Sequence, residues 1–231
     1  MKQTNLRSLL KRLQLLGDPK AAQGMARFGI VSKKVLGVSA VSLRKLAREI
    51  GKDHELAAKL WTRGVLEARL LAALTDEPHK VTEKQMERWV KDFDNWAVCD
   101  TCCSVLFDKT PLAWRKAAEW SRRKEEFVKR AGYALMAALA VHDKAADDRR
   151  FAKFLPPIKR GSTDERNFVK KAVNWALRQI GKRNLKLNKL AIKMANDIHA
   201  IDSPGTRWIA SDALRELTSA AVQRRLRRKK A

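Results

Sequence analysis

Asp100 is the residue whose type and surroundings most directly predict chemistry in this sequence. It lies in the segment 94–107, which is apolar on nearly every side from Trp96 onward and is expected to form a largely buried helix. A carboxylate inside such a helix is destabilising unless it is paired or borders a wet cavity. Trp96 precedes Asp100 by one helical turn, so both side chains share a face. Two interpretations stay open, a salt-bridged structural aspartate and a functional carboxylate beside an aromatic ring.

Arg130 is a second candidate for a functional role. It opens the strongly apolar run 131–141, which places a guanidinium group on a helix that is expected to be buried. The spacing leaves open whether this group meets Asp100 or a phosphate group.

Trp175 has cations on its own helical face, because Lys171 stands four residues before it and Arg178 three residues after it. The core stripe of the same segment runs through other positions, namely Ala172, Val173, Ala176, Leu177 and Ile180. An aromatic ring between cations is typical of a surface that contacts sugar and phosphate or stacks on a base. Trp120 has cations at the same offsets and is interpreted in the same way. The tryptophans assigned to core packing are Trp61, Trp89, Trp114 and Trp208.

The charge of the chain predicts an anionic partner. Its 231 residues include 50 Lys and Arg against 25 Asp and Glu, a formal net charge of +25, and nucleic acid is the leading candidate. Lys186, Lys189 and Lys193 fall on one helical face, and residues 224–230 contain six basic side chains. Each cluster alone also fits a solvated helix face or a disordered tail. Together they favour contact with nucleic-acid phosphates, to which the tail adds affinity without selectivity.

The elements that must position these residues are helices. Apolar residues recur at helical spacing almost throughout, and strand-like alternation is missing. Breaks are expected at clusters of Gly, Pro and Asp, among them 17–19, 51–53, 108–111, 156–162 and 202–205. Ser203 and Pro204 indicate a helix start, and Thr82 to Gln85 reads as a capping box.

Many short helices predict stacked antiparallel helix pairs, because a four-helix bundle of this size would use fewer and longer helices. We therefore predict an all-α fold, a HEAT-like repeat superhelix with a basic concave groove, although no exact repeat period is visible. The chain is short for two hydrophobic cores, so residues 1–231 are expected to form one domain with a basic helix end or tail over 218–231.

Membrane and metal partners are not expected. No stretch approaches the ~18 consecutive apolar residues of a spanning helix, and residues 1–16 lack a signal-peptide core, which predicts a cytoplasmic protein of the bacterial cytosol or nucleoid. Cys99, Cys102 and Cys103 are odd in number and clustered, which favours reduced thiols. A structural zinc site needs four ligands, and the histidines stand alone far away, so neither a metal nor a cofactor is predicted.

Several of these residues fall in motifs of a known family. The sequence resembles the AlkD-like DNA alkylation-repair glycosylases, which consist of HEAT-like repeats, over roughly residues 5–215. Trp96 and Asp100 match the family's Trp-x-x-x-Asp pair. Arg130 matches the arginine of a Lys-Arg-x-x-x-x-Leu motif, and Trp175 the tryptophan of Lys-Ala-x-x-Trp-x-Leu-Arg. The family also has a signature in an early helix pair, and this sequence resembles it at Leu60-Trp61, Glu67-Ala68-Arg69 and Asp76.

The resemblance implies excision of cationic N3- and N7-alkylpurines from duplex DNA, with the lesion remaining stacked. It makes Asp100 the catalytic carboxylate, Arg130 a ligand of backbone phosphate, and Trp96 and Trp175 the contacts to the sugar–phosphate of the lesion. Ordinary glycoside hydrolysis uses two carboxyl groups, but an alkylated purine is already cationic and leaves as a neutral base without a general acid. Asp100 would stabilise the cationic sugar and orient water. No activated lysine is required, so a monofunctional glycosylase is expected. The protein is also expected to be a monomer.

Two alternatives stay open. Asn167 departs from the family pattern, because active members carry a second aromatic residue there, and this departure fits a non-catalytic binder of damaged or branched DNA. A helical scaffold for protein partners or RNA is the other alternative, and it expects the four motif side chains to be dispersed.

Overall fold

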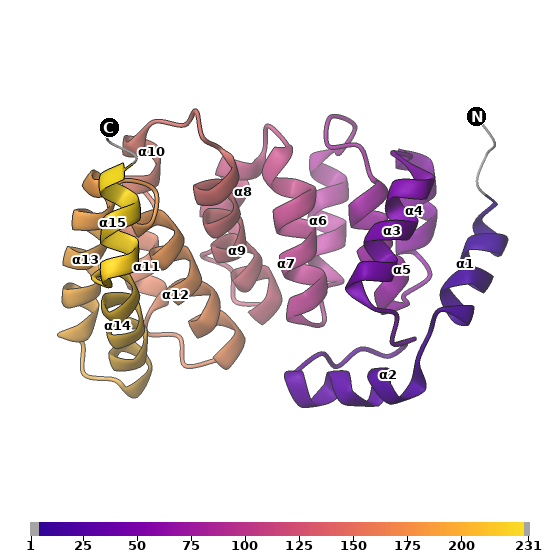
Figure 1. Ribbon diagram of the computed structural model, residues 1–231, viewed down its shortest axis with the longest axis horizontal. Helices are drawn as coiled ribbons and strands as arrows, with labels where there is room; N and C mark the ends of the chain where they lie inside the picture. The colour runs from indigo at the N-terminus through magenta and orange to yellow at the C-terminus, as the bar shows by residue number, and fades with distance from the viewer. Residues whose placement is uncertain (1–4, 229–231) are drawn as a thin grey trace. The chain divides into compact units, whose positions relative to one another are not determined.

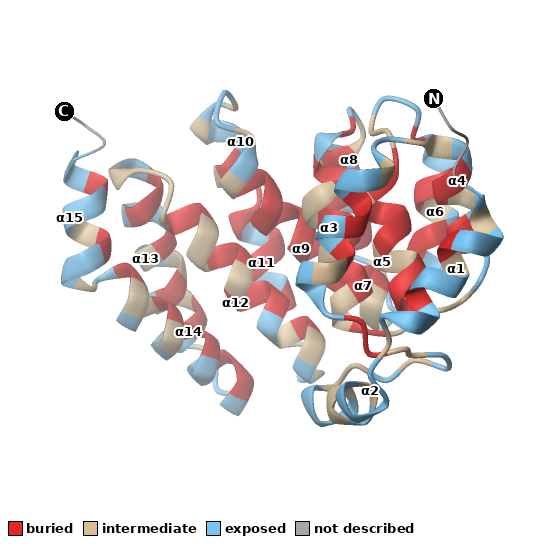
Figure 2. Ribbon diagram, turned by 45° about the vertical axis from the view of Figure 1, so that its right-hand side comes forward, coloured by how far each residue is buried: buried red, intermediate tan, exposed pale blue. Residues whose placement is uncertain are grey.

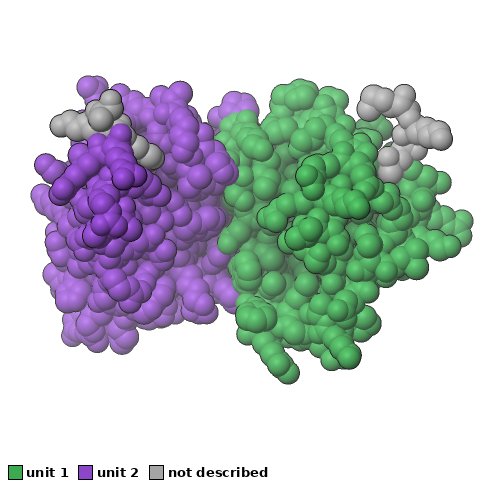
Figure 3. All heavy atoms as spheres, viewed as in Figure 1, with its two compact units in different colours: residues 1–110 green, residues 111–231 purple. Residues whose placement is uncertain are grey.

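The computed structural model describes residues 5–228, and all regular elements within this range are helices (Figure 1). The part of the chain that the structure describes forms fifteen α-helices and two short 3₁₀ helices. The all-α fold class predicted from the sequence is therefore confirmed. Contacts divide the chain into two compact units, residues 1–110 and 111–231 (Figure 3). That the whole chain acts as one domain stays a prediction.

Unit 1 is built around α5. Its helices are α1 (Leu6–Leu15), α2 (Pro19–Met25), η1 (Ala26–Phe28), α3 (Ala40–Ile50), α4 (His54–Trp61), α5 (Leu66–Thr75), α6 (Glu83–Lys91), α7 (Trp96–Val105) and η2 (Phe107–Lys109). Helix α5 packs against α3, α4 and α7, which explains why its sequence is apolar on most sides. The rings of Trp61 and Trp89 stack with centroids 3.9 Å apart, and both are buried as predicted.

Unit 2 is built around α9 and α12. Its helices are α8 (Ala113–Trp120), α9 (Glu126–His142), α10 (Asp148–Ala152), α11 (Leu155–Gly161), α12 (Asn167–Gly181), α13 (Leu185–His199), α14 (Pro204–Leu217) and α15 (Ala220–Arg228). Helix α9 contacts α8 and α12, and α12 also packs against α13 and α14. Figure 2 shows buried residues along most of α9, whereas α15 is largely exposed. A Cβ atom at Gly132 would lie 2.3 Å from the backbone nitrogen of Ser121, so α9 approaches the end of α8 without room for a side chain.

The predicted helix starts are present, with one difference in detail. Ser203 accepts hydrogen bonds from backbone N–H groups of the first turn of α14, and Pro204 occupies its first position. Thr82 accepts a hydrogen bond from the backbone of Gln85 at 3.2 Å. The side-chain amide of Gln85 donates to Asp76 at 2.6 Å, so Gln85 serves the packing of α6 against its neighbours.

The break predicted over residues 156–162 is wrong, because α11 spans Leu155–Gly161. Its two prolines, Pro156 and Pro157, lie in the first turn, where the missing N–H groups have no helical acceptor to lose.

Candidate functional site

Helix α7 carries the first candidate pair. Asn95 begins the helix, and its side-chain oxygen accepts the N–H of Val98 at 3.1 Å. Trp96 and Asp100 are both half-buried and lie one turn apart, followed one turn later by the half-buried Ser104. We call Trp96, Asp100 and Ser104 the open face of α7.

The expectation that α7 is largely buried is therefore corrected. Its opposite face packs against α5 and consists of Val98, Cys99, Cys102 and Cys103, all of which are buried. Small and polar side chains on one side let α7 border solvent there, which places the carboxylate of Asp100 at the margin of the unit 1 core.

The turn before α7 is fixed by polar contacts from α4 and α5. Arg69 donates to the backbone carbonyl of Asp92 at 2.9 Å, and its guanidinium lies 3.7 Å from the carboxylate of Asp94. The indole N–H of Trp61 donates to the carboxylate of Asp92 at 2.7 Å. Because this turn leads directly into Trp96, Arg69 and Trp61 position the start of the open face.

Phe28 is a neighbour of Trp96 that no sequence pattern singled out. The indole N–H of Trp96 donates to the backbone carbonyl of Phe28 at 2.8 Å. The Phe28 side chain is 74% exposed, and Val31 close by in the chain is 68% exposed. The backbone of Phe28 therefore holds the indole of Trp96 in place on the open face of α7.

Glu67 of the early signature has a structural task. Its carboxylate is fully buried and accepts backbone N–H groups of Leu36, Gly37 and Val38, at 2.7 Å for Gly37. Gly37 adopts a positive φ of 80°, and a Cβ atom there would lie 2.1 Å from the carbonyl oxygen of Asp18. Glu67 therefore ties the segment before α3 to α5.

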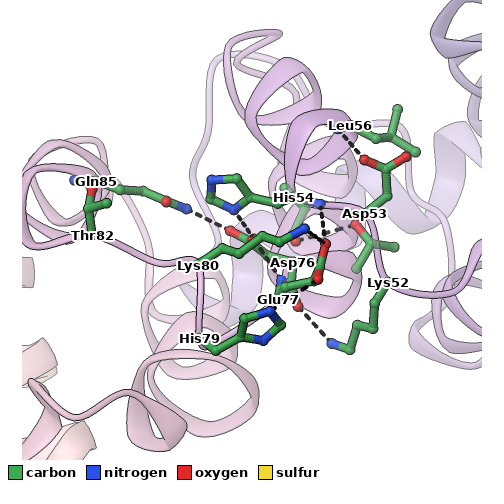
Figure 4. Close-up of polar contacts among 12 residues, drawn as sticks. Lys52, Asp53, His54, Leu56, Asp76, Glu77, His79, Lys80, Thr82 and Gln85 are labelled. Atoms are coloured by element: carbon green, nitrogen blue, oxygen red, sulfur yellow. Dashed lines mark hydrogen bonds and ion pairs between the residues drawn. The ribbon is translucent and has the colours of Figure 1, made fainter.

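Asp76 of the same signature also connects elements of unit 1 (Figure 4). Its buried carboxylate lies 2.6 Å from Nδ1 of His54 and accepts the amide of Gln85 at 2.6 Å and the N–H of Glu77 at 2.7 Å. The ammonium group of Lys52 donates to the Asp76 carbonyl at 2.9 Å. These contacts join α4, the end of α5 and the start of α6, so this part of the signature supports the fold.

The three cysteines lie on the packed side of α7 as fully buried thiols that form no disulfide bond. Burial raises the pKa of Cys102 and Cys103 well above the ordinary value, so both stay protonated at neutral pH. Across residues 5–228, no three His, Cys, Asp or Glu side chains gather into a possible metal site. None of the helices described is long and apolar enough to span a membrane.

In unit 2, Arg130 is buried and anchors the start of α12. Its exposed fraction is 6%, and its guanidinium donates to the backbone carbonyl of Phe168 at 2.5 Å. The ring of Phe168 in turn packs 5.3 Å from that of Phe127. Arg130 thus fixes the first turn of the helix that carries Lys171 and Trp175.

One face of α12 presents the second candidate group. Phe168, Trp175 and Gln179 are half-buried, and Lys171 is exposed. Their spacing places all four on one side of the helix, away from its buried stripe. We call these four residues the open face of α12.

Arg178 was predicted to lie on the same face as Trp175, but it does not belong to the open face of α12. Its guanidinium pairs with Asp212 at 2.8 Å and with Glu216 on α14, and Lys182 also pairs with Glu216 at 2.8 Å. The charge of Arg178 is consumed within the α12–α14 interface, so its assignment to a phosphate contact is corrected. Lys186, Lys189 and Lys193 are exposed on α13, as their spacing predicts.

Two tryptophans exchange the roles predicted for them. Trp120 is 1% exposed within unit 2. The ammonium group of the neighbouring Lys116 is buried with it and pairs with Glu119 at 2.7 Å. The prediction of a DNA contact through Trp120 is therefore corrected.

Trp208, which was assigned to the core, is 41% exposed, and the ammonium group of Lys170 lies 5.8 Å from its ring centroid. Trp208 lies beside the buried stripe of α14, which runs through Gly205, Thr206, Ile209, Ala210, Ala213 and Leu217. The position of Trp208 outside this apolar stripe can be read from the helical spacing of the sequence. Trp114 is half-buried against Phe151 and Phe154.

The structure thus brings Trp96 and Asp100 together on α7, and it joins Arg130 to the helix of Lys171 and Trp175. These two groups belong to different units. A joint Trp–Asp–Arg–Trp cleft and the basic concave groove stay predictions.

Comparison with known proteins gives a family and a fold. The sequence matches a family model described as DNA alkylation repair enzyme over residues 9–217. A solved structure from a family related to the HEAT-like repeat DNA glycosylases, with affinity for branched DNA structures, superposes with a TM-score of 0.78 at 18% identity, covering 92% of this chain and 95% of that chain. A designed armadillo repeat protein in complex with a peptide reaches a TM-score of 0.39 at 15% identity, covering 81% and 89% of the two chains. A second designed armadillo repeat protein reaches 0.40 at 14%, covering 94% and 96%. No curated protein sequence matches the chain significantly.

Proposed function

Since the chain belongs to the DNA alkylation repair enzyme family, we propose that it is a monofunctional glycosylase that releases cationic N3- and N7-alkylpurines from duplex DNA. The family predicted from its motifs is confirmed. The observation that carries the proposal is the position of Asp100 on the open face of α7, one turn from an aromatic ring.

In the proposed reaction, Asp100 supplies the only carboxylate required. The glycosidic bond breaks with its electron pair moving to the base, which leaves neutral because the alkylated ring was cationic. The sugar acquires positive charge, which the Asp100 carboxylate stabilises while it orients the water that attacks C1′, and the proton lost by this water passes to solvent. Trp96 and Asp100 share the open face of α7, so in this proposal the indole ring contacts the sugar that the carboxylate stabilises.

DNA is held by side chains of unit 2 in this proposal. Trp175 contacts the sugar–phosphate near the lesion, Arg130 holds the first turn of the helix that carries it, and exposed cations contact flanking phosphates. The flanking residues are Lys171, Lys186, Lys189 and Lys193. Because phosphate contacts carry little sequence information, selectivity would rest on Asp100, Trp96 and Trp175.

A second candidate function is binding of damaged or branched DNA without excision. Asn167, where the resemblance expects an aromatic residue, is exposed at the start of α12 and adds no ring to its open face. The solved relative with affinity for branched DNA has the same fold, which supports this candidate.

Base release from methylated duplex DNA distinguishes the two functions. Wild-type protein should release 7-methylguanine or 3-methyladenine, and Asp100→Asn should lower the rate at least ~10²-fold while duplex binding persists, because the binding cations are unchanged. Asp202→Asn makes the same charge change at a 97% exposed side chain and should keep the wild-type rate. Release by Asp100→Asn at the wild-type rate contradicts the proposed role. Tight, salt-sensitive binding without release by wild type favours the second candidate.

A further inference from the structure

Unit 2 contains a cationic cavity at the C-terminal end of α12. Its volume is about 290 Å³. It is lined by four basic side chains, two side chains with amide groups and two apolar residues. No acidic residue lines it. The lining residues that matter here are Ala140, Lys144, Gln179, Lys182, Arg183 and Arg225.

Arg183 forms a fixed wall of this cavity. Its guanidinium donates to the carbonyl oxygens of Ala140 and Ala146, both at 3.1 Å, and lies 4.0 Å from the ring centroid of Phe151. Ala140 belongs to the last turn of α9, whose free carbonyl groups would otherwise repel an anion. Arg183 thus removes an obstacle to anion binding at this helix end.

Lys144 and Arg225 leave uncompensated positive charge at the cavity. Both side chains are exposed, and neither forms an ion pair with any residue of the range 5–228. Arg225 is held in place by donating to the carbonyl of Lys182 at 3.4 Å. Lys182 differs, because its ammonium group pairs with Glu216.

Two carboxylates lie near enough to act on the charge of Arg183, and each accepts a hydrogen bond from a neutral donor. Asp148 accepts the side-chain amide of Asn184 at 2.8 Å, and Asp143 accepts the indole N–H of Trp114 at 3.0 Å. Neither lines the cavity. An incoming oxyanion would therefore meet two cations and the amide of Gln179, the donor set that suits a phosphate group.

Gln179 connects this cavity to the open face of α12. It follows Trp175 by one turn, and Trp175 follows Lys171 by one turn, so the three side chains form a row that ends at the cavity. A DNA strand whose sugar contacts Trp175 would carry its next phosphates along this row. We propose that the cavity binds one backbone phosphate of a DNA strand that lies along α12, which rests on the DNA binding in the proposed function. Arg225, part of the basic cluster 224–230, acquires a specific phosphate contact in this way.

The test compares two variants of equal charge. Lys144→Ala/Arg225→Ala removes the two unpaired cations, and Lys159→Ala/Arg160→Ala removes two exposed cations of α11 that do not line the cavity. Affinity for an unmodified duplex is measured by fluorescence anisotropy at several salt concentrations. The slope of log affinity against log salt should fall by about 0.9 in the cavity variant, the value for one phosphate, and clearly less in the control. Equal slopes in the two variants overturn the proposal.

Two further readouts separate the possible failures. Inorganic phosphate titrated into wild type should shift the NMR signal of the Gln179 side-chain amide, and the shift should disappear in the cavity variant. A phosphate-dependent shift with unchanged DNA slopes assigns the cavity to free phosphate and overturns the DNA contact. Absent base release with the expected slopes refutes the glycosylase and leaves the cavity proposal standing. Circular dichroism checks folding, and Arg225→Gln, which keeps much of the side-chain stem, should change the slope in the same direction.

Discussion

At the scale of single residues, the half-buried position of Asp100 suits the proposed reaction. A fully buried carboxylate would be costly to ionise and inaccessible to the attacking water, and a fully exposed one would be screened by solvent. On the open face of α7, the carboxylate borders solvent on one side and the packed core of unit 1 on the other. Its field can therefore act on a bound sugar while water remains within reach.

The tryptophans give a prediction at the same scale. Trp89→Ala should lower the free energy of unfolding by about 3–5 kcal/mol, because it removes a fully buried ring that stacks on Trp61. Trp208→Ala should cost less than about 1 kcal/mol, because this ring is 41% exposed. Urea unfolding followed by circular dichroism measures both, and equal losses would contradict the burial assigned to the two rings.

Residue types and spacing identified the Trp96–Asp100 pair and the row of Lys171 and Trp175, because both follow from helical geometry alone. Spacing failed where packing decides exposure. The cations around Trp120 indicated a surface, yet Lys116 is buried with the ring and pairs with Glu119. A single helix shows which residues share a face, but the neighbour that covers this face comes from elsewhere in the chain.

At the scale of elements, α7 depends on a buried cap. Asn95→Ala should destabilise the protein by about 1 kcal/mol, because the N–H of Val98 loses its acceptor at a site without solvent. The rate of base release should fall as well, since Trp96 and Asp100 follow this cap directly. Asn5→Ala removes the equivalent cap of α1 at an exposed position and should leave the rate unchanged. Thermal unfolding and the glycosylase assay measure the two effects. A wild-type rate of base release in Asn95→Ala would contradict the prediction that this cap positions Trp96 and Asp100.

Caps and helical periodicity made the helices predictable from local sequence. The prediction failed at 156–162, because prolines mark both loops and first helical turns. The tie between Glu67 and the segment 36–38 was also beyond prediction, since it joins groups about thirty residues apart in the chain. Contacts of this kind depend on tertiary packing that spacing does not encode.

At the scale of the whole molecule, the net charge of +25 indicated an anionic partner but not which cations would remain available. Arg178 is paired across α12 and α14, whereas Lys144 and Arg225 are unpaired at the cavity. The difference arises from carboxylates that folding brings near one cation and away from another.

The ion pairs that Asp164 forms with Lys129 and Arg166 predict that the stability of the protein is sensitive to acid. Burial alone would raise the pKa of Asp164, but hydrogen bonds from Arg166 and Lys129 outweigh it and hold the pKa well below its ordinary value. A carboxyl group with a lowered folded-state pKa contributes stability above its unfolded value of 3.8, and this stability is lost as the pH falls toward the folded-state value. Asp164→Asn should therefore cost about 1.5–3 kcal/mol at pH 7 and progressively less below pH ~4. Urea unfolding at several pH values measures this, with Thr163→Ala as the neighbouring control, and a constant difference between wild type and Asp164→Asn would contradict it.

The buried thiols of α7 have a consequence for survival under chemical stress. Electrophiles that methylate purines also attack protein nucleophiles, and the thiolate is the most reactive of these. Cys99, Cys102 and Cys103 are inaccessible in the fold, and burial keeps Cys102 and Cys103 protonated. Iodoacetamide should therefore leave the native protein unlabelled and label it once urea has unfolded it. A protein built in this way can continue to work in a cell exposed to the reagents that damage its DNA.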